Sequence, residues 1–246
     1  MDGRDRRPAA RHRHRDRPRH HDRRVDLDAY DLVIVPTLMV VDDDAAERLR
    51  AVPERGGTLL VTYLSGICGE DGKVITGGFP GAFRDVLGVR CDEFYPLQEG
   101  EQVTLEDGAL VEDWTERVYL DSAEPIVRYA SSSLAGGPAV TRRQVGNGTA
   151  WYVSAPLQPE AVDRIVERLV EEADLLRILE ADPGLEAARR IGPDCSYLFL
   201  LNHTDTERAV TAEGLDLLSG TRVGPAGGVR VVREPDRSTG NPTPAT

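Results

Sequence analysis

Residues 56–88 have the sequence GGTLLVTYLSGICGEDGKVITGGFPGAFRDVLG, and this stretch decides the fold. It contains the run Thr58–Tyr63, whose β-branched and apolar residues are typical of a strand buried in a parallel sheet. Glycines at positions 66, 69 and 72 follow at once and predict a turn. Because open α/β sheets bind their ligands just beyond the end of such a strand, this turn is the first place to look for chemistry.

The residues before this stretch predict a strand followed by a helix. The run Leu32–Val35 is short and apolar, as in a buried strand. Asp42–Asp44 then provide a cap and first-turn charges for a helix. Its apolar positions follow a 3.6-residue period and are Ala45, Ala46, Leu49 and Val52. Pro53 and the glycines at 56 and 57 are expected to end it. With the strand that follows, these elements form a βαβ unit, which predicts a parallel sheet with a right-handed crossover.

The middle of the chain predicts a second helix, several short strands and a third helix. The second helix is expected over Gly81–Leu87. Turn signals separate the strand candidates, which are 101–106, 117–121, 125–130, 138–143 and 149–153. Asn147-Gly148, before the last of them, is a strong hairpin signal. Pro159 fits the first turn of the third helix. Its apolar stripe, which we expect to pack on the sheet, consists of Val162, Ile165, Val166, Leu169, Val170, Ala173, Leu176 and Leu179.

A domain boundary is predicted at Asp182-Pro183-Gly184, because only strand-like runs follow it. These runs cover 185–191, 195–201, 207–212 and 228–233 and indicate a small antiparallel module. The predicted organisation is a disordered basic tail over 1–24, an α/β domain over 25–181, an antiparallel β domain over 182–235 and a disordered polar tail over 236–246.

Charge is divided unevenly along the chain. The net charge is −12, yet residues 1–24 hold ten Arg against four Asp, so the remainder is strongly acidic. An acidic body argues against nucleic-acid binding. The tail is expected to be disordered. The alternatives are a basic arm for phosphates or a metal-binding cluster of His12, His14, His20 and His21. Its monotonous Arg/His/Asp/Pro composition is also typical of GC-rich DNA translated out of frame.

Hydropathy and cysteine usage predict a cytoplasmic chain that does not contact membranes. No apolar run approaches the roughly 18 residues that a membrane span needs. The N-terminus lacks the apolar centre of a signal peptide. Cys68, Cys91 and Cys195 are odd in number and far apart, which argues against a disulfide framework and against a CxxC metal site.

Cys68 is the candidate nucleophile, because it lies just beyond the central predicted strand. A nucleophilic thiol needs a base within hydrogen-bond reach and a lowered pKa. In the amidotransferase-like arrangement a histidine on a late strand-to-helix turn supplies that base, and the corresponding turn here carries Gln158. After the tail, the only histidine is His203, in the predicted C-terminal module. We therefore expect Cys68 to be a packed side chain, with an amidotransferase-like hydrolase as the alternative.

Carboxylates and aromatic residues give weaker signals. Glycosidase chemistry needs two carboxyl groups at a fixed separation, and a full (β/α)₈ barrel takes about 250 residues. The acidic runs Asp42–Asp44 and Glu171-Glu172 are instead interpreted as a helix cap and a solvated face. Of the two tryptophans, Trp151 is expected in the core, whereas Trp114, in a predicted loop, is the candidate contact residue of a sugar-binding module.

Seven stretches occur together in a fixed order: Tyr30–Pro36, Gly56–Gly66, Gly77–Val89, Ala135–Arg142, Ala150–Val153, Tyr197–Thr204 and Asp216–Gly220. Through them, residues 25–234 resemble the region that follows the catalytic barrel in glycoside hydrolase family 42 β-galactosidases. The resemblance implies a trimerisation domain with a glutamine-amidotransferase-like, flavodoxin-related fold and a mainly parallel sheet. It also implies a small antiparallel β domain after it.

The same resemblance implies a barrel with an acid/base Glu after an Asn and a second Glu as nucleophile. This sequence contains no Asn-Glu dipeptide, and only the basic tail precedes residue 25. No catalytic residue can therefore be placed, and no cofactor-binding or metal residue is expected. We predict the non-catalytic oligomerisation part of a family 42 β-galactosidase, which self-associates as a trimer or docks on a barrel-bearing chain. The alternatives are a hydrolase using Cys68 and a galactoside-binding module at Trp114 or on the C-terminal strands.

Overall fold

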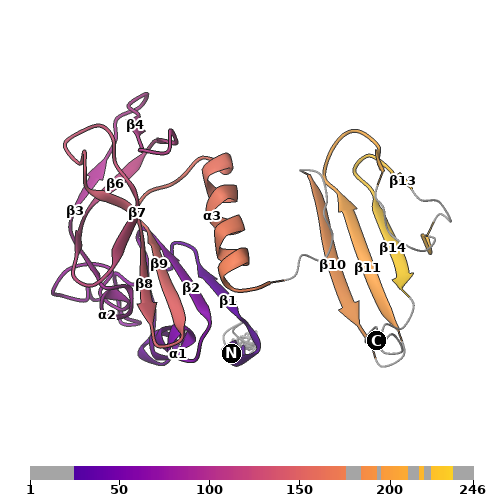
Figure 1. Cartoon of the computed structure of the whole chain (residues 1–246), viewed down its shortest axis with the longest axis horizontal. Coiled ribbons are helices and arrows are strands. Elements are labelled where there is room, and N and C mark those ends of the chain that lie inside the picture. The colour runs from indigo at the N-terminus through magenta and orange to yellow at the C-terminus, as the bar shows by residue number, and fades with distance from the viewer. Residues whose placement is uncertain (1–24, 176–183, 193–194, 210–215, 219–222, 235–246) are drawn as a thin grey trace, which may run out of the picture. The chain divides into compact units, whose positions relative to one another are not determined.

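The computed structural model of the chain describes residues 25–175, 184–192, 195–209, 216–218 and 223–234 (Figure 1). The predicted tails lie outside the described residues, and so do Leu176 and Leu179 of the predicted helical stripe. Contacts divide the chain into two compact units, one ending at Asp174 and the other beginning at Leu175. Each unit has a hydrophobic core of its own.

The first unit begins with alternating strands and helices and then consists mostly of strands. Its elements are, in chain order, η2 Leu27–Ala29, β1 Leu32–Val35, α1 Asp43–Glu54, β2 Thr58–Thr62, α2 Arg84–Leu87, β3 Val89–Pro96, β4 Val103–Thr104, β5 Leu110–Val111, β6 Trp114–Leu120, β7 Glu124–Arg128, β8 Pro138–Val145, β9 Gly148–Val153 and α3 Pro159–Glu172. The helix predicted from Gly81 is confined to α2. Residues 81–83 form a turn instead, in which the N–H of Phe83 donates to the carbonyl of Pro80 (2.9 Å).

A five-stranded sheet in the order β1-β2-β9-β8-β7 forms the centre of the first unit (Figure 1). β2 pairs in parallel with both β1 and β9, as the predicted βαβ unit requires. β8 pairs antiparallel with β9 and with β7. The sheet is therefore mixed, and the prediction of a mainly parallel sheet is wrong for its β7–β9 half. The cause is the short loop between β8 and β9, because strands joined by a two-residue loop pair antiparallel.

The hairpin β8–β9 forms where the sequence predicts it, with its turn one residue earlier. Val145 pairs with Gly148, so the two loop residues are Gly146 and Asn147. Gly146 has a φ of 57°, and a positive φ at the first loop position is what tight hairpin turns require. Gly148 itself cannot carry a side chain, because a Cβ there would lie 2.1 Å from the carbonyl oxygen of Gly57. β9 is consequently buried along its whole length, in close contact with the turn before β2.

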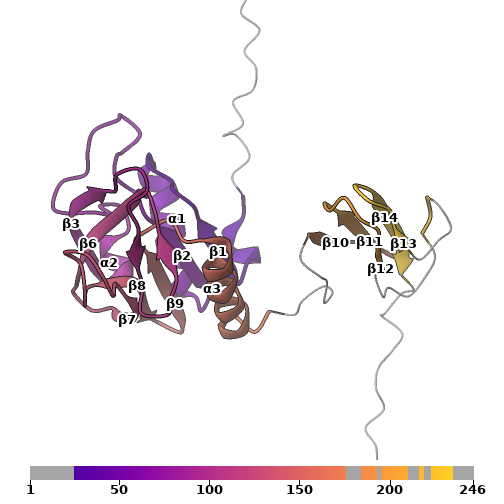
Figure 2. The ribbon, with the colours of Figure 1, turned by 90° about the horizontal axis from the view of Figure 1, so that it is seen from above.

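Helices cover both faces of the central sheet (Figure 2). Successive residues of a strand point to opposite faces. Leu59 of β2 packs with Val52 of α1 in one core cluster. The next residue, Leu60, packs with Trp151 of β9 and Leu169 of α3 in another. The predicted packing of the third helix on the sheet is therefore confirmed for Leu169 and the partly buried Ile165, whereas Val162 of the predicted stripe is 43% exposed. The predicted burial of Trp151 is also confirmed, because it is 0% exposed.

The ends of α1 show how local sequence sets its boundaries. The carboxylate of Asp42 accepts a hydrogen bond from the N–H of Ala45 (2.7 Å), which confirms the predicted cap. The helix runs through Pro53 to Glu54 rather than ending at the proline, whose ring is buried. A proline in the last turn removes one helical hydrogen bond, and burial of its ring offsets that loss.

Two small sheets extend the first unit beyond the central sheet. β3 pairs antiparallel with β6, and β4 pairs antiparallel with β5. β3 is a strand that the sequence did not predict, because a register shift between Cys91 and Glu93 breaks its alternation of apolar and polar residues. Around β4 and β5, buried side chains that include Tyr129 and Leu134 form a further core cluster.

The second unit is built on a three-stranded antiparallel sheet in the order β10-β11-β14, which confirms the predicted antiparallel module. Its elements are β10 Leu185–Ile191, β11 Ser196–Asn202, β12 Arg208–Ala209, β13 Val223–Gly224 and β14 Val229–Glu234. Leu198, Leu200 and Val232 form its core. The Nε of Arg189 lies 2.6 Å from the carboxylate of Glu234, so an ion pair links the two outer strands across β11.

Candidate functional site

Cys68 lies beyond the end of β2 but not on a strand-to-helix turn. It forms β-bridges with Val40 on one side and Val74 on the other, and its side chain is half-buried. The next helix, α2, begins only at Arg84. Within the described ranges no hydrogen bond joins the Cys68 thiol to a base, and residues 25–175 contain no histidine. The geometry therefore does not favour the hydrolase alternative.

The structure gives other positions to Gln158 and His203, the two residues that bear on the missing base. Gln158 is the N-cap residue of α3, and its side chain makes no capping hydrogen bond. His203 belongs to the second unit, where its Nε2 lies 2.9 Å from the carboxylate of Glu186. Gln158 has no basic group, and the described partner of His203 is a carboxylate rather than a thiol.

The structure reveals one polar centre that the sequence analysis missed, the carboxylate of Glu116. This side chain lies on β6 and is 1% exposed. Its Oε1 accepts hydrogen bonds from the indole N–H of Trp114 (3.2 Å) and from the backbone N–H of Leu64 (3.4 Å). Its Oε2 accepts a hydrogen bond from the hydroxyl of Tyr152. Donors from β6, from the turn after β2 and from β9 thus converge on one buried carboxylate.

Burial shifts the protonation of this centre and of the groups around it. It raises the pKa of the Glu116 carboxyl, and the hydrogen bonds that stabilise the charged form oppose this shift. Burial also raises the pKa of Tyr152 well above its ordinary value and that of Tyr129 to about 12. The pKa of the Cys91 thiol is raised by burial and then by the charge of Glu116. Both tyrosines and this thiol therefore remain neutral at physiological pH and act as packing or hydrogen-bonding groups.

The arrangement around Glu116 suits a structural clamp better than a catalytic acid. Glycoside hydrolysis needs a pair of carboxyl groups. In the part of the chain that the structure describes, the groups that hydrogen-bond to Glu116 are a phenol, an indole and a backbone amide. They tie β6 to the ends of β2 and β9. The described residues also contain no group of three or more His, Cys, Asp or Glu that could hold a metal ion.

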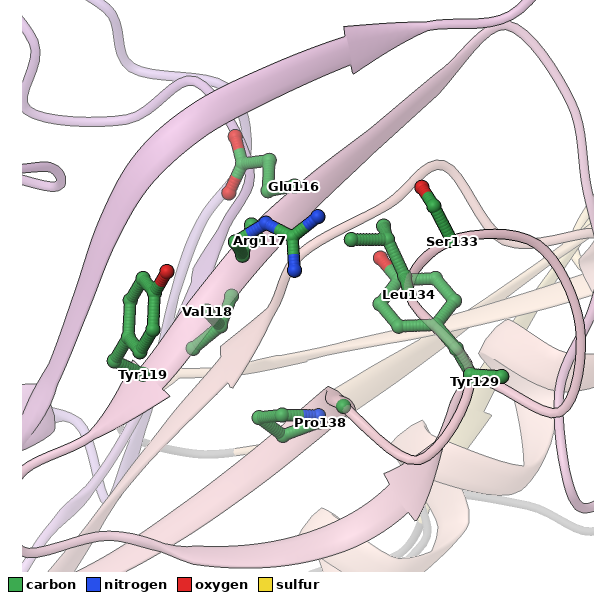
Figure 3. A pocket seen from close by; sticks show the side chains of 10 residues that line it. Glu116, Arg117, Val118, Tyr119, Tyr129, Ser133, Leu134 and Pro138 are labelled. Carbon is green, nitrogen blue, oxygen red and sulfur yellow. The ribbon is translucent and has the colours of Figure 1, made fainter.

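A small pocket adjoins Glu116 (Figure 3). It has a volume of about 210 Å³ and is lined by residues 116–119, 129, 133–135, 137 and 138. Figure 3 shows Arg117 and Tyr119 on β6, with Ser133 and Leu134 on the loop that leads to β8. Pockets that hold small-molecule ligands have volumes of about 300–1,000 Å³. This pocket is smaller than that range and does not point to a ligand class.

Trp114 and Glu172 differ from their predicted roles. Trp114 begins β6 instead of lying in a loop, and its ring packs against Phe94 at a centroid separation of 5.1 Å. An indole engaged internally by both its N–H and its ring is not favoured as a sugar-stacking platform.

Glu172 was expected on a solvated face, but it accepts a hydrogen bond from the Nε of Arg142 (2.8 Å), and its side chain is only 21% exposed. The cause is the close approach of the end of α3 to β8.

Two family models match the chain. Residues 20–176 match the model described as the β-galactosidase trimerisation domain, and residues 184–234 match the one described as the β-galactosidase C-terminal domain. The chain belongs to the glycoside hydrolase family 42 β-galactosidases. Across the described ranges, this family 42 chain has no helix long and apolar enough to span a membrane.

Curated relatives of this family 42 chain are much longer than it is. A β-galactosidase of Arthrobacter sp. is 44% identical over 212 residues, which are 85% of this chain and 30% of that protein. The β-galactosidase LacZ of Heyndrickxia coagulans is 35% identical over 191 residues, which are 76% of this chain and 29% of that protein. The chain therefore spans about 30% of the length of the curated relatives that it matches.

Solved structures of β-galactosidases share the fold. The β-galactosidase from Bacillus circulans sp. alkalophilus matches with a TM-score of 0.78 and 30% identity, over 85% of this chain and 34% of that one. The cold-adapted β-galactosidase from Rahnella sp. R3 matches with a TM-score of 0.77 and 28% identity, over 85% of this chain and 33% of that one. An α/β region followed by a β domain thus also occurs within these longer enzymes.

Proposed function

We propose that this chain forms the self-association and accessory part of a family 42 β-galactosidase and contributes no catalytic residue. The match of residues 20–176 to the trimerisation domain carries the proposal. The chain spans about 30% of its curated relatives. The hydrolysis of terminal β-D-galactosides is therefore assigned to the portion of such an enzyme that this chain does not match.

The polar groups of the first unit support a structural rather than a catalytic role for this chain. The two side chains of the first unit that could most readily take part in catalysis are Cys68 and Glu116. Glu116 is buried under three donors, and no base within the described residues hydrogen-bonds to the half-buried thiol of Cys68. The buried carboxylate stabilises the fold, and a thiol without a base is not activated to attack a substrate.

The proposal includes finer features of the assembly. Either three copies associate through the α/β domain, which we assign to residues 25–181, or the chain docks on a barrel-bearing partner. The β domain is assigned to residues 182–235. The fold is amidotransferase-like, and its support is a parallel β1-β2-β9 core with helices on both faces. A cytoplasmic location is supported by the three free cysteines, Cys68, Cys91 and Cys195.

Two measurements on the purified chain test this function. Hydrolysis of o-nitrophenyl β-D-galactoside is expected to stay at the uncatalysed rate, with an intact family 42 enzyme as the positive control. Turnover that copurifies with the chain and survives repeated purification would contradict the non-catalytic assignment. Sedimentation equilibrium is expected to give a mass near three times 26.9 kDa. A single-chain mass at every concentration would contradict self-association.

A further inference from the structure

Exposed apolar side chains gather on one surface of the first unit, beyond the carboxyl ends of β1 and β2. Leu38, Met39 and Val40 are consecutive and are 37%, 45% and 48% exposed. Val74, which is 54% exposed, lies beside them, because Cys68 bridges it to Val40. Paired residues in adjacent strands put their side chains on the same face. Val40, Cys68 and Val74 therefore form one continuous row, which we call the valine row.

Hydrogen bonds hold the backbone of the valine row in place. The N–H of Cys68 donates to the carbonyl of Met39 (3.0 Å), and the N–H of Val41 donates back to the carbonyl of Cys68 (3.0 Å). On the other side, the N–H of Ile75 donates to the carbonyl of Ile67 (2.8 Å). The row is thus a fixed surface rather than a loose loop, so little conformational entropy is lost when it docks.

Polar groups of both signs border the valine row. Lys73 and Asp71 form an exposed ion pair at 2.6 Å. The exposed carboxylates of Asp43 and Asp44 follow the row at the start of α1. An apolar centre with a polar border is the anatomy of protein–protein interfaces. The mixed charge at the border gives no preference for a strongly charged partner such as nucleic acid.

We propose that the valine row is the centre of the surface through which this chain associates with further copies of itself. The inference rests on the proposed self-association, and it names the residues that carry it. The identity of the occupant is argued from the matched family model, whose description assigns trimerisation to residues 20–176, the range that contains the whole row. In a ring of three identical chains, the row of one copy meets a different surface of the next.

The test compares the full chain with Val40→Asp and Val74→Asp, by sedimentation equilibrium over a concentration series. A charge placed at the centre of an apolar interface is expected to weaken association at least ~30-fold. Tyr30→Asp is the matched control, because Tyr30 is 52% exposed and lies at the opposite end of β1. The control is expected to associate like the unchanged chain. Circular dichroism establishes that each variant folds.

The outcomes separate this inference from the function on which it rests. An unchanged chain that stays monomeric overturns both. An unchanged chain that associates, with valine-row variants that associate equally well, overturns the valine row alone. Loss of association in the Tyr30→Asp control as well would also overturn it, because any added charge would then suffice.

A second readout needs no substitution. Alkylation of Cys68 by a small thiol reagent, followed by mass spectrometry, is expected to slow as the chain concentration rises and the row is covered. Cys195, which is also half-buried but lies in the second unit, serves as the internal reference. A Cys68 rate that keeps a constant ratio to the Cys195 rate across the association range would overturn the proposal.

Discussion

Replacing Glu116 by alanine tests whether the buried carboxylate is a clamp. The substitution leaves the hydroxyl of Tyr152 and the indole N–H of Trp114 without their acceptor. A buried donor without a partner costs about 1–3 kcal/mol. Tyr152 is 1% exposed and belongs at the upper end of this range, whereas Trp114 is only half-buried and belongs at the lower end. The bond from Leu64, at 3.4 Å, is long and adds little.

These terms sum to a loss of about 3–4 kcal/mol in the free energy of unfolding of the first unit. Because whole domains are stable by only about 5–15 kcal/mol, the effect is large. Glu116→Gln is the matched control. Its Oε1 keeps the bonds from Trp114 and Leu64, and its amide N–H donates to the Tyr152 oxygen, although the Tyr152 hydroxyl proton then has no acceptor. We expect this variant to lose about 1–2 kcal/mol, less than the alanine variant.

Urea unfolding followed by tryptophan emission is the appropriate assay. Both tryptophans, Trp114 and Trp151, belong to the first unit, so the signal reports that unit alone even if the two units unfold separately. The midpoint is expected to fall clearly for Glu116→Ala and by a smaller amount for Glu116→Gln. An alanine variant within about 0.5 kcal/mol of the unchanged chain would refute the clamp.

Four further predictions follow from single contacts. Burial raises the pKa of Glu116 above its ordinary value of 4.5, so its contribution to stability is greatest below that pH and declines as the pH rises through the raised pKa. Glu116→Gln should flatten this part of a pH–stability profile, and an unchanged profile would contradict it. At pH 7.5, iodoacetamide should modify the half-buried Cys68 much faster than Cys91, whose pKa burial raises; equal rates in a mass-spectrometric time course would oppose this. Gly148→Ala should lower the melting temperature by several degrees, because its Cβ would lie 2.1 Å from a carbonyl oxygen; an unaltered melting curve would count against that contact. Asp42→Ala should cost about 1 kcal/mol in urea unfolding through loss of the α1 cap, with Asp43→Ala as the control; equal losses would argue against capping.

The sequence predicts those elements of the fold that local patterns set. α1 is recognisable from its cap and its 3.6-residue period, and the β8–β9 hairpin from its Gly-Asn-Gly turn. In the pairing of β9 with β2, Leu60 lies opposite Trp151, and no local sequence pattern predicts this pairing. The sequence therefore does not indicate that the antiparallel β8–β9 hairpin belongs to the same sheet as the parallel β1–β2 pair. β3 was missed because its bulge interrupts the alternation.

The buried carboxylate has a signal in the sequence, but a weak one. Trp114 and Glu116 stand two residues apart in a strand, so their side chains share a face. An acidic side chain on a strand is ordinarily exposed to water. Only the tertiary fold brings the hydroxyl of Tyr152 to the carboxylate of Glu116. Carboxylates of this kind are therefore predictable only once strand pairing is known.

The position of β9 in the sheet has a consequence for how the chain acquires its structure. β1 and β2 are complete by Thr62, but the neighbour that β2 needs on its other side begins only at Gly148. Because a ribosome adds about 5–20 residues per second, one edge of β2 has no strand to pair with for several seconds of synthesis. Contacts that span so much chain form slowly. The fully buried strand that completes the sheet is thus synthesised near the end of the first unit, and a chain interrupted before it exposes an unpaired edge open to aggregation.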